Sequence, residues 1–244
     1  MLEKLLIVVA VKDRIEVTRR CLENLAAVKA PQDMLAVFND ASKEYDATWC
    51  RLFGDLVFNT EKSLGIHRQR ALHFQLAKKL FDKDPEFTRL YFTDADVIHD
   101  PEWRAQAIRL QDANDGSPVC LYDTLAHSCL EGNTLKDEEG SEVILRRFAP
   151  GVSYLLTRDH VDVLIERLPI IANGGGWDWE VPNLLGNMMV ISRVGYCDHI
   201  GIGGERHPKS DGPDGGDRVK QPTPFLVNKR AEIVRELTNT IASQ

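Results

Sequence analysis

Hydrophobic and polar residues alternate along the start of the chain in a pattern that predicts strands and helices in turn. Residues 5–11 (LLIVVAV) are continuously apolar and rich in β-branched side chains, which is typical of a strand buried on both faces of a parallel sheet. Val17, Cys21, Leu22 and Leu25 then follow helical spacing. We therefore expect a helix whose apolar face packs on that strand.

Three more strands and a long helix are predicted before residue 110. Short apolar runs mark strands at 34–38, 56–58 and 87–92, and residues 65–80 have the apolar spacing of an amphipathic helix. Strands that alternate with helices predict an α/β fold, with a Rossmann-like, mostly parallel central sheet flanked by helices. Ligands bind such sheets at the carboxyl ends of the strands.

The second half of the chain has a weaker pattern. We expect strands at 119–122, 148–157 and 188–194 and helices at 159–168, 181–185 and 231–241, whereas the polar residues 133–142 and the Gly-rich residues 201–217 predict exposed loops. No linker separates two units. The expected organisation is a single domain over 1–244, with a first half at about 1–110, a second half at about 111–205, and a Gly-rich loop and C-terminal helix over 201–244.

Composition and charge narrow the functional classes. Apolar residues make up 43% of the 244 residues, charged residues 27%, and the formal net charge is −7. These values predict a globular protein and disfavour a broad nucleic-acid-binding surface. The scattered cysteines favour reduced thiols, and no apolar run is long enough to span a membrane. We therefore expect a cytoplasmic protein; its oligomeric state is left open.

Aspartates follow three of the predicted strands: Asp13, Asp40, and the pair Asp94 and Asp96. One such residue is usually a turn or helix-capping residue, but the carboxyl ends of parallel strands meet at one edge of a sheet. In an extended segment Asp94 and Asp96 point to the same side, and two like charges favour a bound cation. The sequence predicts a Mn²⁺ or Mg²⁺ site; a solvated acidic turn near Asp100 is the alternative.

These motifs, in this order, resemble the family 2 glycosyltransferases of GT-A fold. The family's first strand ends in an Asn-Arg-like pair, here Asp13-Arg14, and its second in a turn that holds the nucleotide base, here residues 39–42 (NDAS). Its Asp-x-Asp motif matches Asp94 and Asp96. The resemblance implies that Asp94 reaches the ribose and Asp96 the metal.

A Gly-x-x-x-x-Arg-Asn segment of the family opens a helix near the ribose and metal. Gly65 and Arg70 match it, but Ala71 stands where Asn is expected. Arg68 and Arg70 lie two residues apart, so they do not share a helix face, and Arg70 is the one expected to face the phosphates. The resemblance thus implies a nucleotide site of Asp13, Asp40, Arg70 and Asp94. Separately, residues 203–209 (GGERHPK) offer backbone N–H groups and basic side chains, Arg206 among them, for a diphosphate; a surface loop is the alternative.

The second half also resembles the family. Residues 151–154 (GVSY) match an acceptor-side segment, and residues 176–180 (GWDWE) resemble Gly-Glu-Asp-Trp-Asp, whose central Asp is the catalytic base of inverting members. Asp178 is the expected base and Glu180 its alternative, because Trp177 replaces the usual Glu. A helix N-cap is the other reading of Asp178.

The remaining assignments concern sugar and metal binding. Gly176, Trp177 and Trp179 are expected at the sugar or acceptor, since aromatic rings stack on sugar faces, although both tryptophans also suit a core. His199 lies in a segment that resembles the family's C-terminal His-x-Gly, which implies a third metal ligand or a contact to the diphosphate; a structural histidine is the alternative.

The resemblance implies a metal-dependent, inverting glycosyltransferase that moves a sugar from a nucleotide-sugar, in the first place a UDP-sugar, to an acceptor hydroxyl. The acceptor is not identified by the sequence. A non-catalytic nucleotide- or sugar-binding module is an alternative, because Trp177 replaces an acidic residue. A nucleotidyltransferase is a second one, but the glycine-rich signature that such enzymes carry after the first strand is missing from residues 10–14 (AVKDR).

Overall fold

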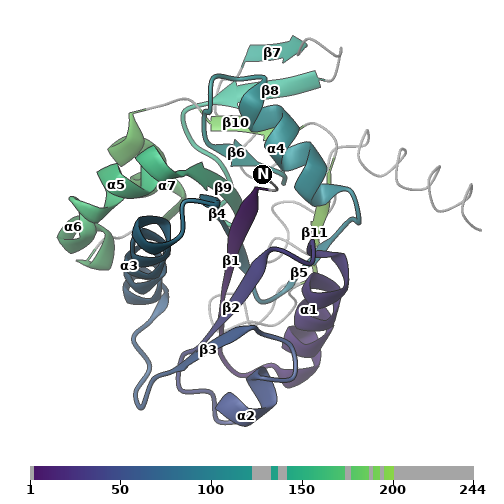
Figure 1. Cartoon of the computed structure of the whole chain (residues 1–244), viewed down its shortest axis with the longest axis vertical. Helices are drawn as coiled ribbons and strands as arrows, with labels where there is room; N and C mark the ends of the chain where they lie inside the picture. The colour runs from purple at the N-terminus through teal and green to yellow at the C-terminus, as the bar shows by residue number, and fades with distance from the viewer. Residues whose placement is uncertain are drawn as a thin grey trace, which may run out of the picture.

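Within the part of the chain that the structure describes, nine strands form one twisted sheet through the centre of the molecule, in the order β3-β2-β1-β4-β9-β6-β10-β8-β7. The structure is a computed structural model that describes residues 3–122, 133–136, 142–173, 177–186, 189–192 and 195–200. Figure 1 shows the sheet between two groups of helices. The expected α/β class, a central sheet flanked by helices, is confirmed. The strand pairs β1–β2, β1–β4 and β2–β3, which come from the first part of the chain, are all parallel.

The parallel part comprises β1 (Lys4–Val11), β2 (Met34–Asn39), β3 (Leu56–Asn59) and β4 (Phe87–Asp94). β1 lies between β2 and β4, and Val8 is paired with both neighbours. The side chains of β1 are buried from Leu5 to Val9 because helices cover both faces of the sheet. All four of these strands are predicted by the apolar runs in the sequence.

Antiparallel pairs join the second half of the chain to the same sheet. It contributes β6 (Val119–Cys120), β7 (Asn133–Lys136), β8 (Glu142–Arg146), β9 (Ser153–Thr157) and β10 (Met189–Ser192). β9 lies between β4 and β6 and is antiparallel to both. The prediction of a loop at 133–142 is wrong for residues 133–136, because they form β7, which pairs with β8. β7 is the outermost strand, and edge strands tolerate polar sequences.

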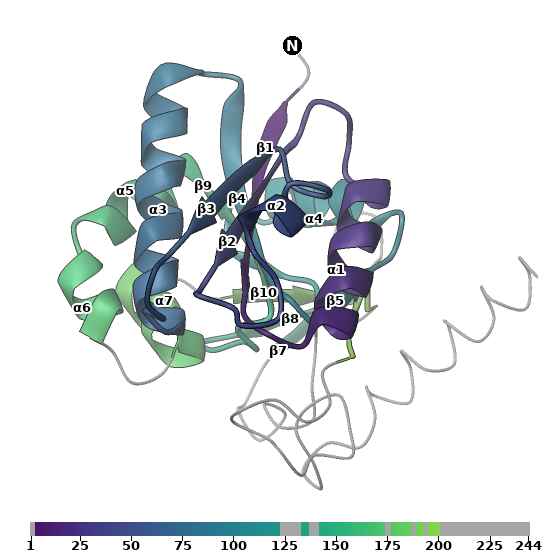
Figure 2. The same cartoon turned by 90° about the horizontal axis from the view of Figure 1, so that it is seen from below.

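Two groups of helices cover the sheet, as both views show (Figures 1 and 2). One group comprises α3 (Ile66–Lys83), α5 (Arg158–Ile165), α6 (Leu168–Asn173) and α7 (Trp177–Leu185). The other side carries α1 (Ile15–Val28) and α4 (Trp103–Asp112), and the short α2 (Ala47–Cys50) follows β2. No helix in the described residues is long and apolar enough to cross a membrane.

A separate two-stranded sheet connects distant parts of the chain. β5 (Val97–His99) pairs antiparallel with β11 (Cys197–His199), so that His199 stands opposite Val97. Asn24 on α1 holds β5 through two hydrogen bonds: its Nδ2 donates to the His99 carbonyl at 3.0 Å, and its Oδ1 accepts from the His99 N–H at 2.6 Å. The end of β5 is thereby fixed against α1.

Acid is expected to weaken the fold through buried histidines. The N–H of Thr157, the residue that caps α5, donates to Nδ1 of His160, which requires a neutral ring. Burial lowers the pKa of His160 to about 4 and that of His99 to about 3. An unfolded histidine titrates near about 6.5, so between pH 6.5 and 4 the unfolded chain binds the extra proton. The free energy of unfolding should fall as pH falls through this window.

Urea denaturation at pH 7, 6 and 5 measures this effect. Each such histidine contributes a slope of at most about 1.4 kcal/mol per pH unit. His160→Gln should make the dependence on pH less steep, leaving the contributions of the buried His99 and His73, whose pKa values burial also lowers. A slope that is unchanged in the variant would contradict the assignment to His160.

Candidate active site

The carboxyl ends of β1, β2 and β4 meet at one edge of the sheet, as the sequence predicts. Val11 at the end of β1 is paired with Asn39 of β2, and Ala10 with Asp94 of β4. Asp40 follows directly after β2, Asp13 is the second residue after β1, and Asp96 lies in the turn between β4 and β5. The four predicted aspartates therefore occupy one edge.

Asp13 joins the loops after β1 and β2. Its Oδ1 accepts hydrogen bonds from the Lys43 N–H at 2.7 Å and the Ser42 hydroxyl at 3.2 Å. The Tyr45 hydroxyl donates to the Asp13 carbonyl at 3.0 Å. In this structure the carboxylate of Asp13 organises the two loops at the sheet edge.

Asp40 holds the segment that leads into α3. Its carboxylate accepts hydrogen bonds from the Ser63 hydroxyl (2.7 Å), the N–H groups of Leu64 (2.7 Å) and Gly65 (3.1 Å), and Gln69 Nε2 (2.8 Å). Burial opposes ionisation of Asp40, but these donors outweigh it, and its pKa lies below the ordinary value. Gly65 adopts φ 76°, which favours glycine and lets its N–H face the carboxylate.

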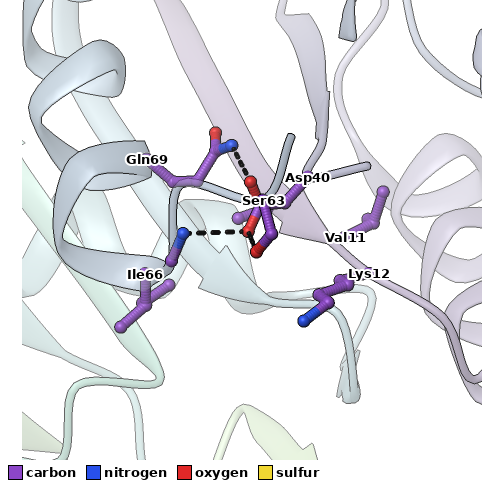
Figure 3. Close-up of a pocket in the computed structure, with 8 residues that line it drawn as sticks. Val11, Lys12, Asp40, Ser63, Ile66 and Gln69 are labelled. Carbon is purple, nitrogen blue, oxygen red and sulfur yellow. Dashed lines mark hydrogen bonds between the residues drawn. The ribbon is translucent and has the colours of Figure 1, made fainter. Parts of the chain in front are cut away.

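A pocket of about 280 Å³ opens beside Asp40 (Figure 3). The ends of β1 and β2 form one wall, and the start of α3 forms the other. Its lining residues are Ala10, Val11, Lys12, Asp40, Ser63, Gly65, Ile66 and Gln69. Sequence reasoning did not assign Lys12, Ser63 or Gln69, although Ser63 stands in a polar turn before the helix and Gln69 one helical turn after Gly65.

Arg70 is placed differently from its expected position facing the phosphates. Its side chain is only 1% exposed, its NH2 group lies 2.6 Å from Oδ1 of Asp94, and its guanidinium stacks over the Phe92 ring with a 4.5 Å separation. Arg68 is exposed. Arg70 therefore acts on the site through Asp94, which it orients.

Asp96 joins three segments of the chain. Its Oδ2 lies 2.9 Å from NH1 of Arg14 and its Oδ1 lies 3.0 Å from Nε2 of His199, while its carbonyl accepts from the Ile200 N–H at 2.7 Å. Burial opposes ionisation of Asp96, but His199 and Arg14 outweigh it, so its pKa is lowered. The structure thus brings Asp96 and His199 together, although 102 residues lie between them in the sequence.

Asp96 and His199 suit a divalent cation of the kind that the sequence predicts. Among the described residues, no group of three or more His, Cys, Asp and Glu side chains is arranged to hold a metal. Magnesium-type ions, however, are often held by one or two protein carboxylates, with water and ligand phosphates completing the shell. A carboxylate beside an imidazole, with Asp94 close in sequence, fits that requirement.

The acceptor-side motif is only partly described. Gly176 and Arg206 lie outside the described residues, as does the expected helix 231–241. α7 begins at Trp177, earlier than expected, so Asp178 lies inside the helix and its interpretation as an N-cap is wrong. The backbone of Trp177 and Trp179 is in the same helix, and Glu180 there is half-buried.

Solved structures share this arrangement of strands and helices. The chain is similar to GalNAc-T7 with UDP, GalNAc and Mn²⁺ (TM-score 0.58, 11% identity, 78% of this chain and 42% of that chain). It is also similar to residues 1–349 of TarS from S. aureus with UDP-GlcNAc (TM-score 0.54, 14% identity, 80% of this chain and 57% of that chain). No protein-family model and no curated protein sequence matches the chain.

These similarities define the class of fold. At 11% and 14% identity they show the fold alone, and that fold is GT-A. The chain spans about half the length of these neighbours, 42% and 57%. The neighbours are glycosyltransferases whose structures contain UDP or a UDP-sugar, and one of them contains Mn²⁺.

Proposed function

We propose that the protein is a glycosyltransferase that uses a divalent cation and a UDP-sugar, and transfers the sugar to an acceptor hydroxyl with inversion. One observation carries the proposal: in a GT-A fold, Asp96 and His199 lie 3.0 Å apart at the sheet edge where β4 ends in Asp94 and where the pocket beside Asp40 opens. Five separate segments of sequence contribute to this edge: residues 10–14, 40, 63–70, 94–96 and 199.

Donor binding is assigned to the pocket and the adjoining strand ends. Asp40 shapes the pocket by holding the segment 63–65, and Lys12 in the lining supplies a cation suited to an anionic ligand. Arg70 orients Asp94, which the family resemblance assigns to the ribose. Asp96 and His199 would hold Mn²⁺ or Mg²⁺, which supplies positive charge where the departing diphosphate becomes more negative.

Transfer requires a base on the acceptor side. The carboxylate of Asp178, or alternatively of Glu180, accepts the proton of the acceptor hydroxyl as that oxygen bonds to the anomeric carbon. The bond from this carbon to the diphosphate oxygen breaks, and UDP leaves with the electron pair. Attack from the face opposite to the leaving group inverts the anomeric centre. We place Trp177 and Trp179 beside the sugar or the acceptor.

Thermal denaturation with UDP, GDP, CDP and ADP, each with and without Mn²⁺, tests the proposal. A ligand present at 100 times its Kd stabilises the folded state by about 2.7 kcal/mol. We expect UDP with Mn²⁺ to give the largest rise in Tm, and UDP without the cation a smaller one. If no nucleotide gives a Mn²⁺-dependent rise, the protein does not have the proposed function.

A further inference from the structure

Arg14 forms an ion pair with the carboxylate of Asp96, the group that a bound cation would need as a ligand. The two oxygens of Asp96 contact different groups: NH1 of Arg14 at 2.9 Å and Nε2 of His199 at 3.0 Å. The Asp96 side chain is 13% exposed, so solvent has little access to it. A neutral imidazole can become a metal ligand, but a guanidinium keeps its positive charge and has no lone pair to offer.

The backbone places Arg14 in this position at an energetic cost. Asp13 and Arg14 both adopt left-handed conformations, with φ 51° and 55°, which are uncommon for residues other than glycine. Arg14 is the N-cap residue of α1, a position where the side chains that stabilise a helix are acceptors, and its guanidinium reaches Asp96 instead. Such strain persists where the surrounding structure enforces it, and it is concentrated at functional sites.

We propose that Arg14 competes with the divalent cation for Asp96 and thereby couples cation binding to binding of the diphosphate. Without a cation, Arg14 neutralises Asp96. A cation bound at Asp96 repels the guanidinium, whose preferred partners are then phosphate oxygens, which it binds in a bidentate manner. This inference rests on the proposed function, because it assumes that Asp96 is a cation ligand.

Mn²⁺ binding to the full chain tests the competition directly, for example by electron paramagnetic resonance of the free ion. Arg14→Ala is expected to lower the Kd for Mn²⁺ about fivefold, because the cation then no longer has to displace a partly exposed ion pair, whose stability corresponds to about that factor. In the Asp96→Asn background the same change should have no effect, since the shared partner is gone. Arg68→Ala removes the same charge from an exposed position on α3 and should leave Mn²⁺ binding as in the wild type.

Titrations repeated with UDP test the coupling. UDP should tighten Mn²⁺ binding more in the wild type than in Arg14→Ala, because only the wild type has an arginine to transfer to the diphosphate. Arg14→Lys keeps the charge without the planar guanidinium. UDP should tighten its Mn²⁺ binding less than in the wild type and more than in Arg14→Ala. It also serves as a second variant if Arg14→Ala does not fold.

Two negative results are distinguishable. In the first, the wild type binds Mn²⁺, and Arg14→Ala either binds it no more tightly or gains affinity no more than Arg68→Ala does. This result would overturn the competition while leaving the proposed function intact. If neither the wild type nor any Arg14 variant binds Mn²⁺, even with UDP, the cation-dependent function itself is wrong and this inference with it.

Discussion

Replacing Asp96 by Asn is expected to weaken Mn²⁺ binding by more than about 100-fold. Mutating a residue that only supports a metal ligand already lowers metal affinity by about 10–100-fold, and Asp96 is expected to be a ligand itself. The change removes a negative charge and one of the ligand oxygens while keeping the shape of the side chain. UDP should then stabilise the protein equally with and without Mn²⁺, and sugar transfer should fall at least as far as Mn²⁺ affinity. Isothermal titration with Mn²⁺ and an assay of UDP release from UDP-sugars measure both effects.

Asp100→Asn is the matched control for this experiment. Asp100 directly follows β5, whereas Asp96 directly precedes it. The Oδ1 of Asp100 accepts a hydrogen bond from the Glu102 N–H at 2.8 Å, and the Asn carbonyl can accept the same bond. This variant should retain Mn²⁺ binding and transfer. Equal losses in both variants, or retained Mn²⁺ dependence in Asp96→Asn, would show that the cation binds elsewhere.

Replacing Asp178 by Asn is expected to lower kcat by about 10²–10⁴-fold, the usual contribution of a general base, with donor binding unchanged. The amide cannot take up the acceptor proton at neutral pH, whereas the pocket beside Asp40 and the carboxylate of Asp96 lie on other segments of the chain. Steady-state kinetics with a UDP-sugar and an active acceptor, together with titration of UDP and Mn²⁺, separate transfer from donor binding.

Glu180→Gln is the comparison that decides between the two carboxylates, since both residues lie in the first part of α7. We expect it to reduce transfer much less than Asp178→Asn does. The opposite order would make Glu180 the base. If both variants transfer at the wild-type rate, or the wild type binds UDP without any turnover, the motif on α7 does not act as a base; the latter result would indicate a binding module.

The parallel part of the fold and the aspartates at its edge could be predicted because their signals are local. A buried parallel strand such as β1 is recognisable as an apolar run, and the residue after such a strand lies at the edge where ligands bind. Asp13, Asp40 and Asp94 follow from this rule alone. The strand at 133–136 was missed because polar edge strands and loops have similar compositions.

The contacts inside the site could not be predicted because they join residues that are distant in sequence. The spacing of Arg68 and Arg70 indicated that one of them faces the site, but not that Arg70 lies beneath Asp94 and stacks on Phe92. The approach of His199 to Asp96 depends on three residue pairs between β5 and β11. No local pattern specifies that pairing.

The position of β9 between β4 and β6 also matters while the protein is being synthesised. β4 is complete at Asp94, but its partner begins only at Ser153, 59 residues later. At about 5–20 residues per second, β4 is without this neighbour for roughly 3–12 s on the ribosome. During that time its edge, with Tyr91 and Phe92, can pair with other nascent chains. Slow translation of this segment would therefore lengthen the period in which this edge of β4 is open to such pairing.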